Sequence, residues 1–414
     1  MGRAIEPVVV IGGGAAGIIA AWRASTLGAK VILLEKTPRL GTKILISGGG
    51  KCNITHDGPL EDVLRAFRPN EARFIRPACY RFTNREIVEM LTSRGLEVYT
   101  RPDGRIFPTH GTAKDVVAIL ADYLREAGVQ VRLETPVAGI QITDGVVTGV
   151  QTATGLISSS RVIVATGGSS YPASGTTGDG WKWLRSAGHT IVKLRAALAP
   201  MYMETPRPEL SGIAFRDCVL KARQGGKEVA RWRDDMLFTH RGVSGPTVLG
   251  ISRAVSEAKE RGEVLLEVDT LPDLTFERLG TEILEAAAAH PKRLVRTWVE
   301  TQLPERLALE TLVLASIVPE MTLGQLPAKS RNRLIEVLKA CPLGSVALVN
   351  LEKGEVVAGG VALDEVDPHT MASRRVSGLF LCGEALDIAG PVGGYNLQAA
   401  FATGFVAGES AAGG

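Results

Sequence analysis

Three glycines near the N-terminus have the spacing of a phosphate-binding turn. Gly12, Gly14 and Gly17 form G-x-G-x-x-G directly after a β-branched run, and a carboxylate, Glu35, lies 18 residues beyond the last of them. The first glycine permits a tight turn, the second lets the backbone approach a pyrophosphate, and the third lets a helix pack closely on a strand. The carboxylate can accept hydrogen bonds from ribose hydroxyls and would repel a 2′-phosphate. These residues predict a dinucleotide site that does not suit NADP.

The flanking residues supply the elements that such a turn requires. Residues 8–11 indicate a buried parallel strand, residues 15–27 a helix that ends at Gly28, and residues 30–34 a second strand. A glycine motif inside a βαβ unit is far more specific than the glycines alone. The unit does not by itself distinguish FAD from NAD.

Later segments favour FAD. Gly41-Thr42-Lys43 and then Ser47 to Asn53, SGGGKCN, form a polar glycine-rich loop after the second strand. An NAD domain has little use for such a loop, whereas a flavoprotein needs one beside the ribityl chain and the isoalloxazine ring. A flexible surface loop is the alternative interpretation. Residues 129–140, VQVRLETPVAGI, suggest two strands around a corner at Pro136, with the backbone of Val137 against the adenine; an ordinary β-turn explains them equally well.

Two further strands end on polar glycine motifs. Residues 161–168, RVIVATGG, continue into SSYPASGTTGDG, and residues 378–384, GLFLCGE, end in a glycine and an acid. In FAD domains a Gly-acid pair of this kind contacts the pyrophosphate and ribityl end of the cofactor. Residues 390–397, GPVGGYNL, open a last helix, and its N-terminus could stabilise negative charge on the flavin pyrimidine. Strands from both ends of the chain therefore meet one ligand, which implies a discontinuous FAD domain.

The predicted cofactor contacts come from all of these segments. They are Gly12, Gly14, Ala15, Ala16, Gly17, Glu35, Lys36, Thr42, Lys43, Ser47, Gly48, Gly49, Gly50, Cys52, Asn53, Val137, Thr166, Gly167, Gly168, Gly383, Glu384, Gly393, Gly394, Tyr395, Asn396 and Leu397. No metal is expected, because the six histidines form no ligand-spaced pair and the five cysteines contain no C-x-x-C.

The catalytic residues are not determined, because the flavin itself performs the redox chemistry. Three side chains are weak candidates. Lys43 could approach flavin N5 or a phosphate, Tyr171 could donate a proton or only pack on the ring, and His240 could be a general acid or a structural histidine. The pKa of the Cys52 thiol could be lowered by Lys51, although packing beside the flavin is favoured over redox chemistry.

Composition limits the remaining classes. The chain has 414 residues and a net charge of +3, from 47 Lys and Arg against 44 Asp and Glu, which argues against a dedicated nucleic-acid binder. An odd number of scattered cysteines suits a reducing compartment. The first residues show no signal-peptide pattern, and no uncharged apolar stretch reaches the length of a membrane span. The expected location is the cytoplasm.

The middle of the chain reads as an inserted domain. Residues 190–269 show the alternation of short strands, and residues 274–339 show helical spacing. The expected division is an FAD-binding domain over 1–190 and 345–414 and an insert over 191–344, β-rich to 271 and helical from 272. Such an insert commonly covers the substrate pocket, and a partner surface is the alternative.

The sequence resembles the BaiN/YhiN-like family of FAD-dependent oxidoreductases. The matching blocks are GGGAAG (12–17), GTKILISGGGKCN (41–53), GRIFP (104–108), ATGGSSYPASGTTGDG (165–180), LFTHRGVSGP (237–246), GGVALDEVDPHTM (359–371) and CGEALDIAGPVGGYNLQAAFATG (382–404). The resemblance implies an α/β fold with a Rossmann-like, glutathione-reductase-type FAD domain, discontinuous around a β-rich and helical insert. Some relatives are linked to reduction of conjugated bonds in steroid-like bile acids, and others are labelled amine oxidases.

The leading hypothesis is therefore an FAD-dependent oxidoreductase that transfers hydride between flavin and an apolar or amphipathic organic substrate. One form of it is reduction of a conjugated C=C bond with NAD(P)H bound transiently. The alternatives are an FAD-dependent amine oxidase, a tRNA-modifying flavoprotein and a flavin-bound interaction protein. Basic clusters at Arg231-Trp232-Arg233 and Lys329 to Arg333 motivate the RNA alternative, although such clusters are usually solvated surface. The sequence determines neither the substrate, the electron donor or acceptor, the stereochemistry nor the oligomeric state.

Overall fold

The computed structural model describes residues 6–413, which divide into two compact units. The two-segment unit combines the chain up to Arg195 with the chain from Glu355 onward, and the insert unit comprises Ala196–Gly354. The sequence placed these boundaries at 190/191 and 344/345. The first of those positions is the start of strand β11 (Ile191–Ala197), and the second lies inside strand β17 (Cys341–Val349), which belongs to the insert unit.

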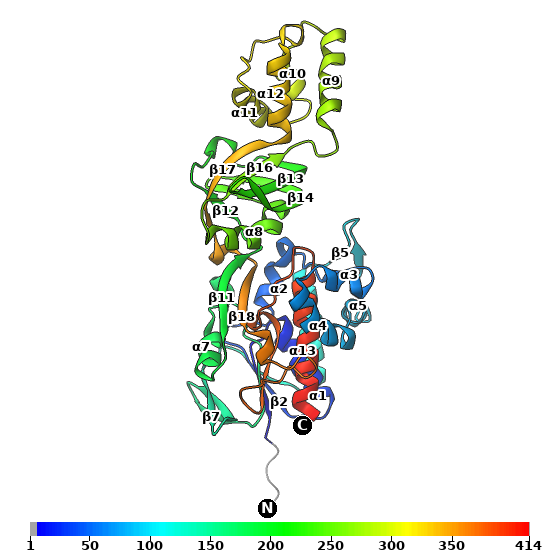
Figure 1. Cartoon of the computed structure of the whole chain (residues 1–414). Coiled ribbons are helices and arrows are strands. Elements are labelled where there is room, and N and C mark those ends of the chain that lie inside the picture. The colour runs from blue at the N-terminus through cyan, green and yellow to red at the C-terminus, as the bar shows by residue number, and fades with distance from the viewer. Residues whose placement is uncertain (1–5, 414) are drawn as a thin grey trace, which may run out of the picture. The chain divides into compact units, whose positions relative to one another are not determined.

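A five-stranded parallel sheet forms the centre of the two-segment unit (Figure 1). The strand order is β19-β10-β1-β2-β6, so β10 and β19 from later in the chain extend the sheet beside β1. The central strands are short runs of Val, Ile and Leu buried on both faces, as expected for a parallel sheet covered by helices. The bounds are β1 Val8–Ile11, β2 Val31–Leu34, β6 Gln130–Arg132, β10 Val162–Val164 and β19 Leu379–Leu381.

The first and last helices of the chain pack against each other, as Figure 1 shows. A Cβ on Gly404 or Gly408 of α13 (Tyr395–Gly413) would lie 2.3 or 2.2 Å from the carbonyl oxygens of Ala16 and Ala20 in α1 (Ala15–Thr26). Glycine at these two positions therefore permits an approach that no larger residue allows. The contact brings the N-terminus of α13 into the same unit as the phosphate turn.

Smaller elements complete the two-segment unit. Antiparallel sheets are formed by β7-β8-β9 and β3-β5-β4, and β11 pairs with β18. The strands are β3 Thr55–His56, β4 Val98–Thr100, β5 Arg105–Pro108, β7 Val137–Thr143, β8 Val146–Thr152, β9 Gly155–Ser158 and β18 Val356–Val361. The helices are α2 Thr42–Ile46, α3 Leu60–Arg65, α4 Pro69–Arg81, α5 Asn84–Thr92, α6 Ala113–Glu126 and α7 Asp179–Ser186.

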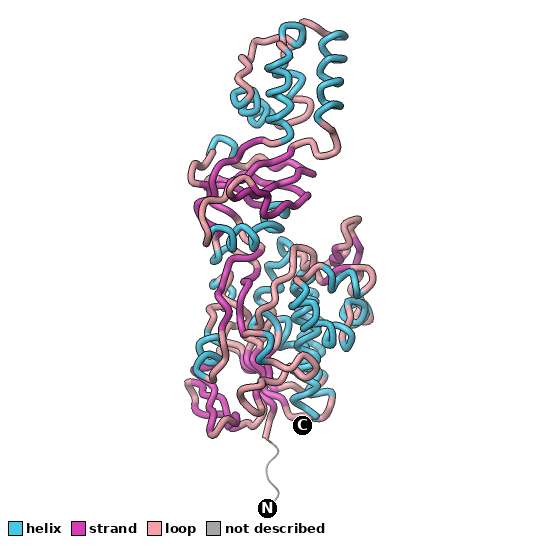
Figure 2. The backbone as a smooth tube through the Cα atoms, viewed as in Figure 1, coloured by secondary structure: helices cyan, strands magenta, loops and turns pink. Residues whose placement is uncertain are grey.

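The insert unit is a closed barrel followed by a group of helices (Figure 2). The barrel order is β12-β15-β14-β13-β16-β17, and the four helices α9 to α12 leave it after β16 and return at β17. One hydrophobic core continues from the barrel into the helices. The bounds are β12 Met201–Met203, β13 Ala214–Gln224, β14 Lys227–Thr239, β15 Gly242–Ser244, α8 Pro246–Lys259, β16 Leu265–Asp269, α9 Phe276–Ala289, α10 Val295–Val299, α11 Glu305–Leu314 and α12 Ala328–Lys339.

The expected fold class is confirmed: the chain is α/β, with a Rossmann-type parallel sheet built from both ends of the sequence and a β-rich and helical insert. None of the helices within residues 6–413 combines the length and hydropathy that a bilayer crossing requires.

Candidate functional site

The phosphate turn has the geometry of an open anion site. After β1, Gly12 turns the chain with φ +107°, and α1 begins at Ala15 without a side chain capping its N-terminus. A Cβ on Gly14 would meet no protein atom within 4 Å, whereas a Cβ on Gly17 would lie 1.8 Å from the Gly12 carbonyl oxygen. Packing inside the protein thus requires Gly17, and the space beside Gly14 is open to a ligand. Free N–H groups and the helix dipole suit a pyrophosphate there.

Glu35 is fixed by two backbone amides. Its Oε2 accepts from Gly13 N–H at 2.7 Å and its Oε1 from Thr37 N–H at 2.8 Å. The carboxylate therefore joins the phosphate turn to the end of β2, and each oxygen keeps a second lone pair for a ribose hydroxyl. The side chain of the neighbouring Lys36 is held in place, since its Nζ donates to Thr177 Oγ1 at 2.6 Å and to Asp179 Oδ2 at 2.8 Å. This ion pair ties the 169–180 loop to β2 and lowers the pKa of Asp179.

A second charged group joins three of the predicted segments. Lys43 Nζ, from α2, lies 2.6 Å from Glu384 Oε2 and 3.0 Å from Ser170 Oγ. Glu384 Oε1 also accepts from Val357 N–H at 2.8 Å, so that β18 is held by the same carboxylate. A Cβ on Gly168 would lie 2.9 Å from Glu384, which places the A-T-G-G turn directly beside it. The tertiary structure thus brings Lys43, Gly168 and Glu384 together from positions more than a hundred residues apart.

The buried hydroxyl of Thr166 supports a polar ligand at this turn. Its Oγ1 is shielded from solvent and makes no hydrogen bond within residues 6–413. Buried polar atoms in proteins usually have a partner, so an unpaired one needs an explanation. A cofactor that reaches the end of β10 would supply the missing partner. Gly167 adjoins it with φ +70°, and Gly383, which precedes Glu384, would contact the Ala16 side chain if it carried a Cβ.

The three glycines of the 47–53 loop adopt the left-handed backbone conformation. Gly48, Gly49 and Gly50 have φ of +56°, +67° and +88°, and Ser47 Oγ donates to the Ile44 carbonyl at 2.8 Å. Cys52 is fully buried with φ +62°, and burial raises the pKa of its thiol to about 12. The expectation of a lowered pKa for this thiol is therefore wrong, because desolvation by burial outweighs the opposing hydrogen bond with Ser47. A packing role for Cys52 remains the interpretation.

The loop before α13 meets the segment that follows the glycine loop. With its amide in the orientation that satisfies both of its atoms, Asn53 accepts from Gly394 N–H at 3.0 Å and donates to the Thr55 carbonyl at 3.2 Å. Asn396 exchanges hydrogen bonds of 2.8 and 2.9 Å with the backbone of Gly390, so its side chain shapes this loop. The N–H groups in the first turn of α13, at Tyr395 to Leu397, remain available to a ligand.

Sequence reasoning missed an aromatic and cationic cluster at the start of α13. The His56 ring stacks on Tyr395 with centroids 4.6 Å apart, and His56 Nδ1 lies 3.2 Å from the Gly393 carbonyl oxygen. Arg105 pairs with His56 across β3 and β5, and paired residues in an antiparallel ladder point to the same face. Arg105 is only 8% exposed. The G-R-I-F-P block of residues 104–108 was the available signal in the sequence, but its register against β3 is a tertiary property.

The remaining predicted residues are more peripheral. Thr42 begins α2 and contacts the Thr37 hydroxyl at 3.3 Å, and Val137 begins β7 and is partly buried. Tyr171 is 41% exposed and has φ +55°. His240 belongs to the insert unit, where it is exposed in the turn between β14 and β15. Of the three catalytic candidates, only Lys43 lies inside the network of predicted cofactor residues.

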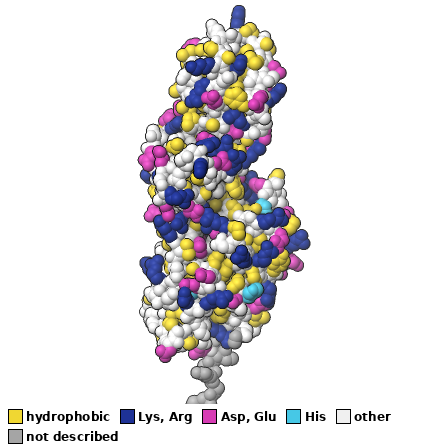
Figure 3. All heavy atoms as spheres, in the orientation of Figure 1, with side chains coloured by type: hydrophobic (Ala, Val, Ile, Leu, Met, Phe, Trp, Pro, Cys, Tyr) yellow, Lys and Arg dark blue, Asp and Glu magenta, His cyan; other side chains and the backbone are white. Residues whose placement is uncertain are grey.

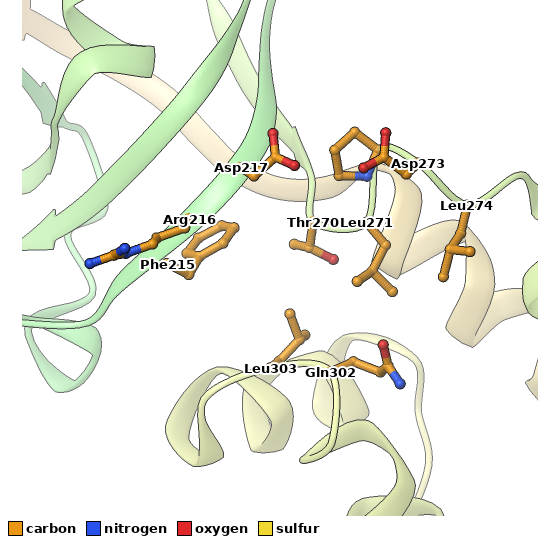
Figure 4. Close-up of a pocket in the computed structure, with 10 residues that line it drawn as sticks. Phe215, Arg216, Asp217, Thr270, Leu271, Asp273, Leu274, Gln302 and Leu303 are labelled. Carbon is orange, nitrogen blue, oxygen red and sulfur yellow. The ribbon is translucent and has the colours of Figure 1, made fainter. Parts of the chain in front are cut away.

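The insert unit has a cavity of its own, of about 290 Å³, between the barrel and the helices (Figure 4). Asp217 and Asp273 lie on one side of it, and Arg216 extends away from them. Arg233 binds both carboxylates, with Nε 2.7 Å from Asp217 Oδ1 and Nη2 2.7 Å from Asp273 Oδ1. The arginine neutralises the two acids, lowering the pKa of Asp217, so this cavity offers no reactive acid–base pair.

Together the open phosphate turn, the fixed acid at the end of β2 and the Gly-acid turn after β19 define a Rossmann-type FAD site, and thus an FAD-dependent oxidoreductase. The model of the family described as HI0933-like protein Rossmann domain matches residues 6–410, and the chain belongs to this family. The resemblance to BaiN/YhiN-like oxidoreductases is thereby confirmed, and FAD is the cofactor.

Curated relatives and a solved structure agree with this assignment. The chain is 31% identical to the ribosomal RNA dihydrouridine synthase of Escherichia coli, over 95% of both chains. It is also 31% identical to the 3-dehydro-bile acid delta(4,6)-reductase of Clostridium scindens, over 97% of this chain and 98% of that protein. The structure of 3-ketosteroid delta1-dehydrogenase from Sterolibacterium denitrificans superimposes with a TM-score of 0.54 at 14% identity, covering 98% and 99% of the two chains, which shows a shared fold.

Proposed function

We propose that the protein reduces a C=C bond conjugated to a carbonyl group, with electrons from a dihydronicotinamide. One observation carries this proposal: two kinds of relative, equally similar over nearly the whole chain, have names that describe the same reaction. Dihydrouridine is uridine saturated at the C=C bond next to a ring carbonyl. A delta(4,6)-reductase of a 3-dehydro bile acid saturates bonds conjugated to the 3-oxo group. The substrates differ greatly, and the reacting group is common to both.

The arrangement of this chain suits such a reaction. FAD supplies the hydride when it is bound. The phosphate turn and Glu35 would hold its adenosine half, while Glu384, fixed by Lys43 and by Val357 N–H, would orient the ribityl chain. The N-terminus of α13 would place partial positive charge at the pyrimidine edge, where negative charge accumulates on reduction. Lys43 serves in this scheme as a positioning residue, because its ammonium is engaged by Glu384 and Ser170.

An anaerobic absorbance titration tests the proposal. NADH and then NADPH are added to the purified holoprotein, and the bleached protein is mixed with 2-cyclohexen-1-one, 4-androstene-3,17-dione or uridine. Return of the flavin band with formation of a saturated product supports a reductase. Bleaching by amines alone, followed by recovery in air, would replace it with an amine oxidase. Flavin that no donor reduces would leave only a flavin-bound interaction protein.

A second candidate is reduction of uridine within an RNA, which the similarity to the E. coli enzyme favours. The charge distribution of the insert unit argues against it. Arg231 and Arg233 are bound by Glu228 and by Asp217 and Asp273. On the face in Figure 3, Lys and Arg side chains are interspersed with Asp and Glu over the upper part of the view. Binding of a ribosomal RNA fragment with a steep dependence on salt would favour this candidate.

We further propose a cytoplasmic location. The five cysteines are free thiols and all are buried, which suits a reducing compartment. Cell fractionation with an antibody against the protein tests this proposal.

A further inference from the structure

Two polar side chains are buried in the last helix, and the roles proposed above use neither of them. Gln398 and Thr403 of α13 are both 0% exposed, and the other buried residues of this helix are Ala, Gly, Val or Phe. Taking a polar group out of water costs free energy unless it finds a hydrogen-bond partner inside the protein. The partners of these two side chains therefore indicate what the polar groups do.

Thr403 bonds to the turn that follows β19. Its hydroxyl accepts from Gly383 N–H at 3.0 Å and donates to the Ala399 carbonyl, one turn earlier in the helix, at 2.6 Å. Gly383 directly precedes Glu384, the acid assigned above to the ribityl side of the cofactor. The middle of α13 is thus fixed to the Gly-acid turn.

Gln398 bonds to β3 and to the end of α4. Its Nε2 donates to the Phe82 carbonyl at 2.9 Å, and its Oε1 accepts from Thr55 Oγ1 at 2.8 Å. Because a carbonyl only accepts, Phe82 determines the orientation of the amide, and Thr55 must be the donor to its oxygen. Thr55 is also fully buried, so solvent does not compete for these hydrogen bonds.

The backbone of Thr55 also lies against the residue that precedes α13. A Cβ on Gly394 would be 2.5 Å from the carbonyl carbon of Thr55, so the two backbones are in direct contact. The Gly394 carbonyl accepts from Gln398 N–H at 3.1 Å, and Gly394 N–H donates to the Asn53 amide at the end of the glycine loop. Gln398, Thr55 and Gly394 thus hold the first turn of α13 against the 47–53 loop.

Directional hydrogen bonds are needed at this position because the contact with α1 does little to fix α13 along its axis. That contact passes through Gly404 and Gly408, which have no side chains to interlock with α1. A shift of the helix by one residue would move its N-terminus by about 1.5 Å, enough to break a hydrogen bond from a first-turn N–H group to a ligand. The bonds of Gln398 oppose such a shift, because it would leave buried polar groups unpaired.

We propose that Gln398, through its hydrogen bond with Thr55, is a positioning residue that holds the first-turn N–H groups of α13 on the pyrimidine edge of FAD and so favours the reduced ring. This inference rests on the proposed function for the placement of FAD, and it does not depend on which substrate is reduced. The first-turn N–H groups are the positive end of the helix dipole, and reduction adds negative charge to the pyrimidine. A correctly aimed helix therefore stabilises the reduced ring more than the oxidised ring.

The test compares the holoprotein with Gln398→Leu, Thr55→Val and Thr55→Ser. Leucine has a similar volume without the amide, valine replaces the hydroxyl by a methyl group, and serine keeps the hydroxyl. Thr311→Val is the matched control, because Thr311 of α11 is also buried and its hydroxyl donates to the Leu307 carbonyl at 2.8 Å. The midpoint potential of bound FAD is measured against a reference dye. The affinity for sulfite, which adds to flavin N5 and leaves negative charge on the pyrimidine, is measured from bleaching of the flavin band.

We expect Gln398→Leu and Thr55→Val to weaken the preference of the protein for reduced over oxidised FAD about tenfold, which lowers the two-electron potential by about 30 mV. The Kd for sulfite should also rise about tenfold, whereas Thr55→Ser and Thr311→Val should stay within about twofold of the wild type on both measures. If Gln398→Leu retains no FAD, Thr55→Val decides the question, because exchange of a hydroxyl for a methyl group preserves the shape of the side chain.

A merely structural role gives a different result. If Thr55→Val lowers the melting temperature but keeps the wild-type potential and sulfite affinity, the hydrogen bonds only stabilise the fold and the inference is overturned. Neither measurement requires a substrate. A wild-type protein that reduces no C=C probe would therefore overturn the proposed function, while the potentials and sulfite affinities of the variants would still decide the role of Gln398.

Discussion

Replacement of Gly14 by alanine separates cofactor binding from folding. The backbone at Gly14 has φ −84° and ψ −170°, which alanine adopts without strain, and its Cβ would meet no protein atom within 4 Å. The apoprotein should therefore change its free energy of unfolding by no more than about 0.5 kcal/mol, as for other substitutions that touch nothing. A methyl group at this position would instead occupy the space through which the N-terminus of α1 approaches a pyrophosphate.

The loss of FAD affinity follows from the hydrogen bonds that the methyl group prevents. An N–H donor must come within about 3 Å of a phosphate oxygen, and a hydrogen bond to a charged group contributes about 1.5–3 kcal/mol. Loss or lengthening of two such bonds would cost about 3 kcal/mol, which raises the Kd for FAD by about a hundredfold. Titration of the apoprotein with FAD, followed by quenching of flavin fluorescence, measures this change, and thermal unfolding by circular dichroism measures the apoprotein.

Two further glycine variants act as controls. Gly139→Ala places a methyl group in open space on β7 and should change neither property. Gly17→Ala would force a Cβ to within 1.8 Å of the Gly12 carbonyl oxygen, so it should impair folding and FAD binding together. If Gly14→Ala bound FAD as tightly as the wild type, the assignment of the pyrophosphate to the N-terminus of α1 would be wrong.

Three other predictions concern single contacts. Lys43→Met removes the cation that pairs with Glu384, so the Kd for FAD should rise about tenfold. A double-mutant cycle with Glu384→Gln should show that the two residues are energetically coupled. Additive effects on the Kd would contradict a joint role of the ion pair in FAD binding. Desolvation alone would raise the pKa of Glu365, but hydrogen bonds from Arg375, Thr190 and His189 hold it at about 2. Its contribution to stability is therefore complete above the ordinary pKa of a glutamate and lost as the pH falls toward 2. Glu365→Gln should lower the free energy of unfolding by about 2 kcal/mol at pH 7. If the melting temperature of the variant fell with decreasing pH in the same way as that of the wild type, this assignment of the acid dependence to Glu365 would be refuted. Gly280 lies inside α9, and a Cβ added there would lie 3.7 Å from Ile335 Cδ1, an ordinary van der Waals distance. Gly280→Ala should therefore stabilise the insert unit by about 0.5–1 kcal/mol without changing FAD binding. Urea unfolding followed by tryptophan fluorescence measures this stabilisation.

The sequence by itself determined the elements that hold the cofactor. Local chemistry sufficed for the phosphate turn, because a tight turn, an open helix N-terminus and a carboxylate at the end of the next strand all lie within the first 35 residues. It also indicated that β10 and β19 join the same sheet, because each is a short apolar strand that ends in a glycine turn. The α/β class, the discontinuous domain and the FAD cofactor followed from these local patterns.

Only the tertiary structure decided which side chains meet. Lys43 contacts Glu384, and His56 stacks on Tyr395, across more than three hundred residues of chain. The pKa of Cys52 depends on burial, which its neighbour Lys51 does not reveal. Spacing along a chain fixes local geometry, whereas contact, burial and electrostatic environment depend on segments that only folding brings together.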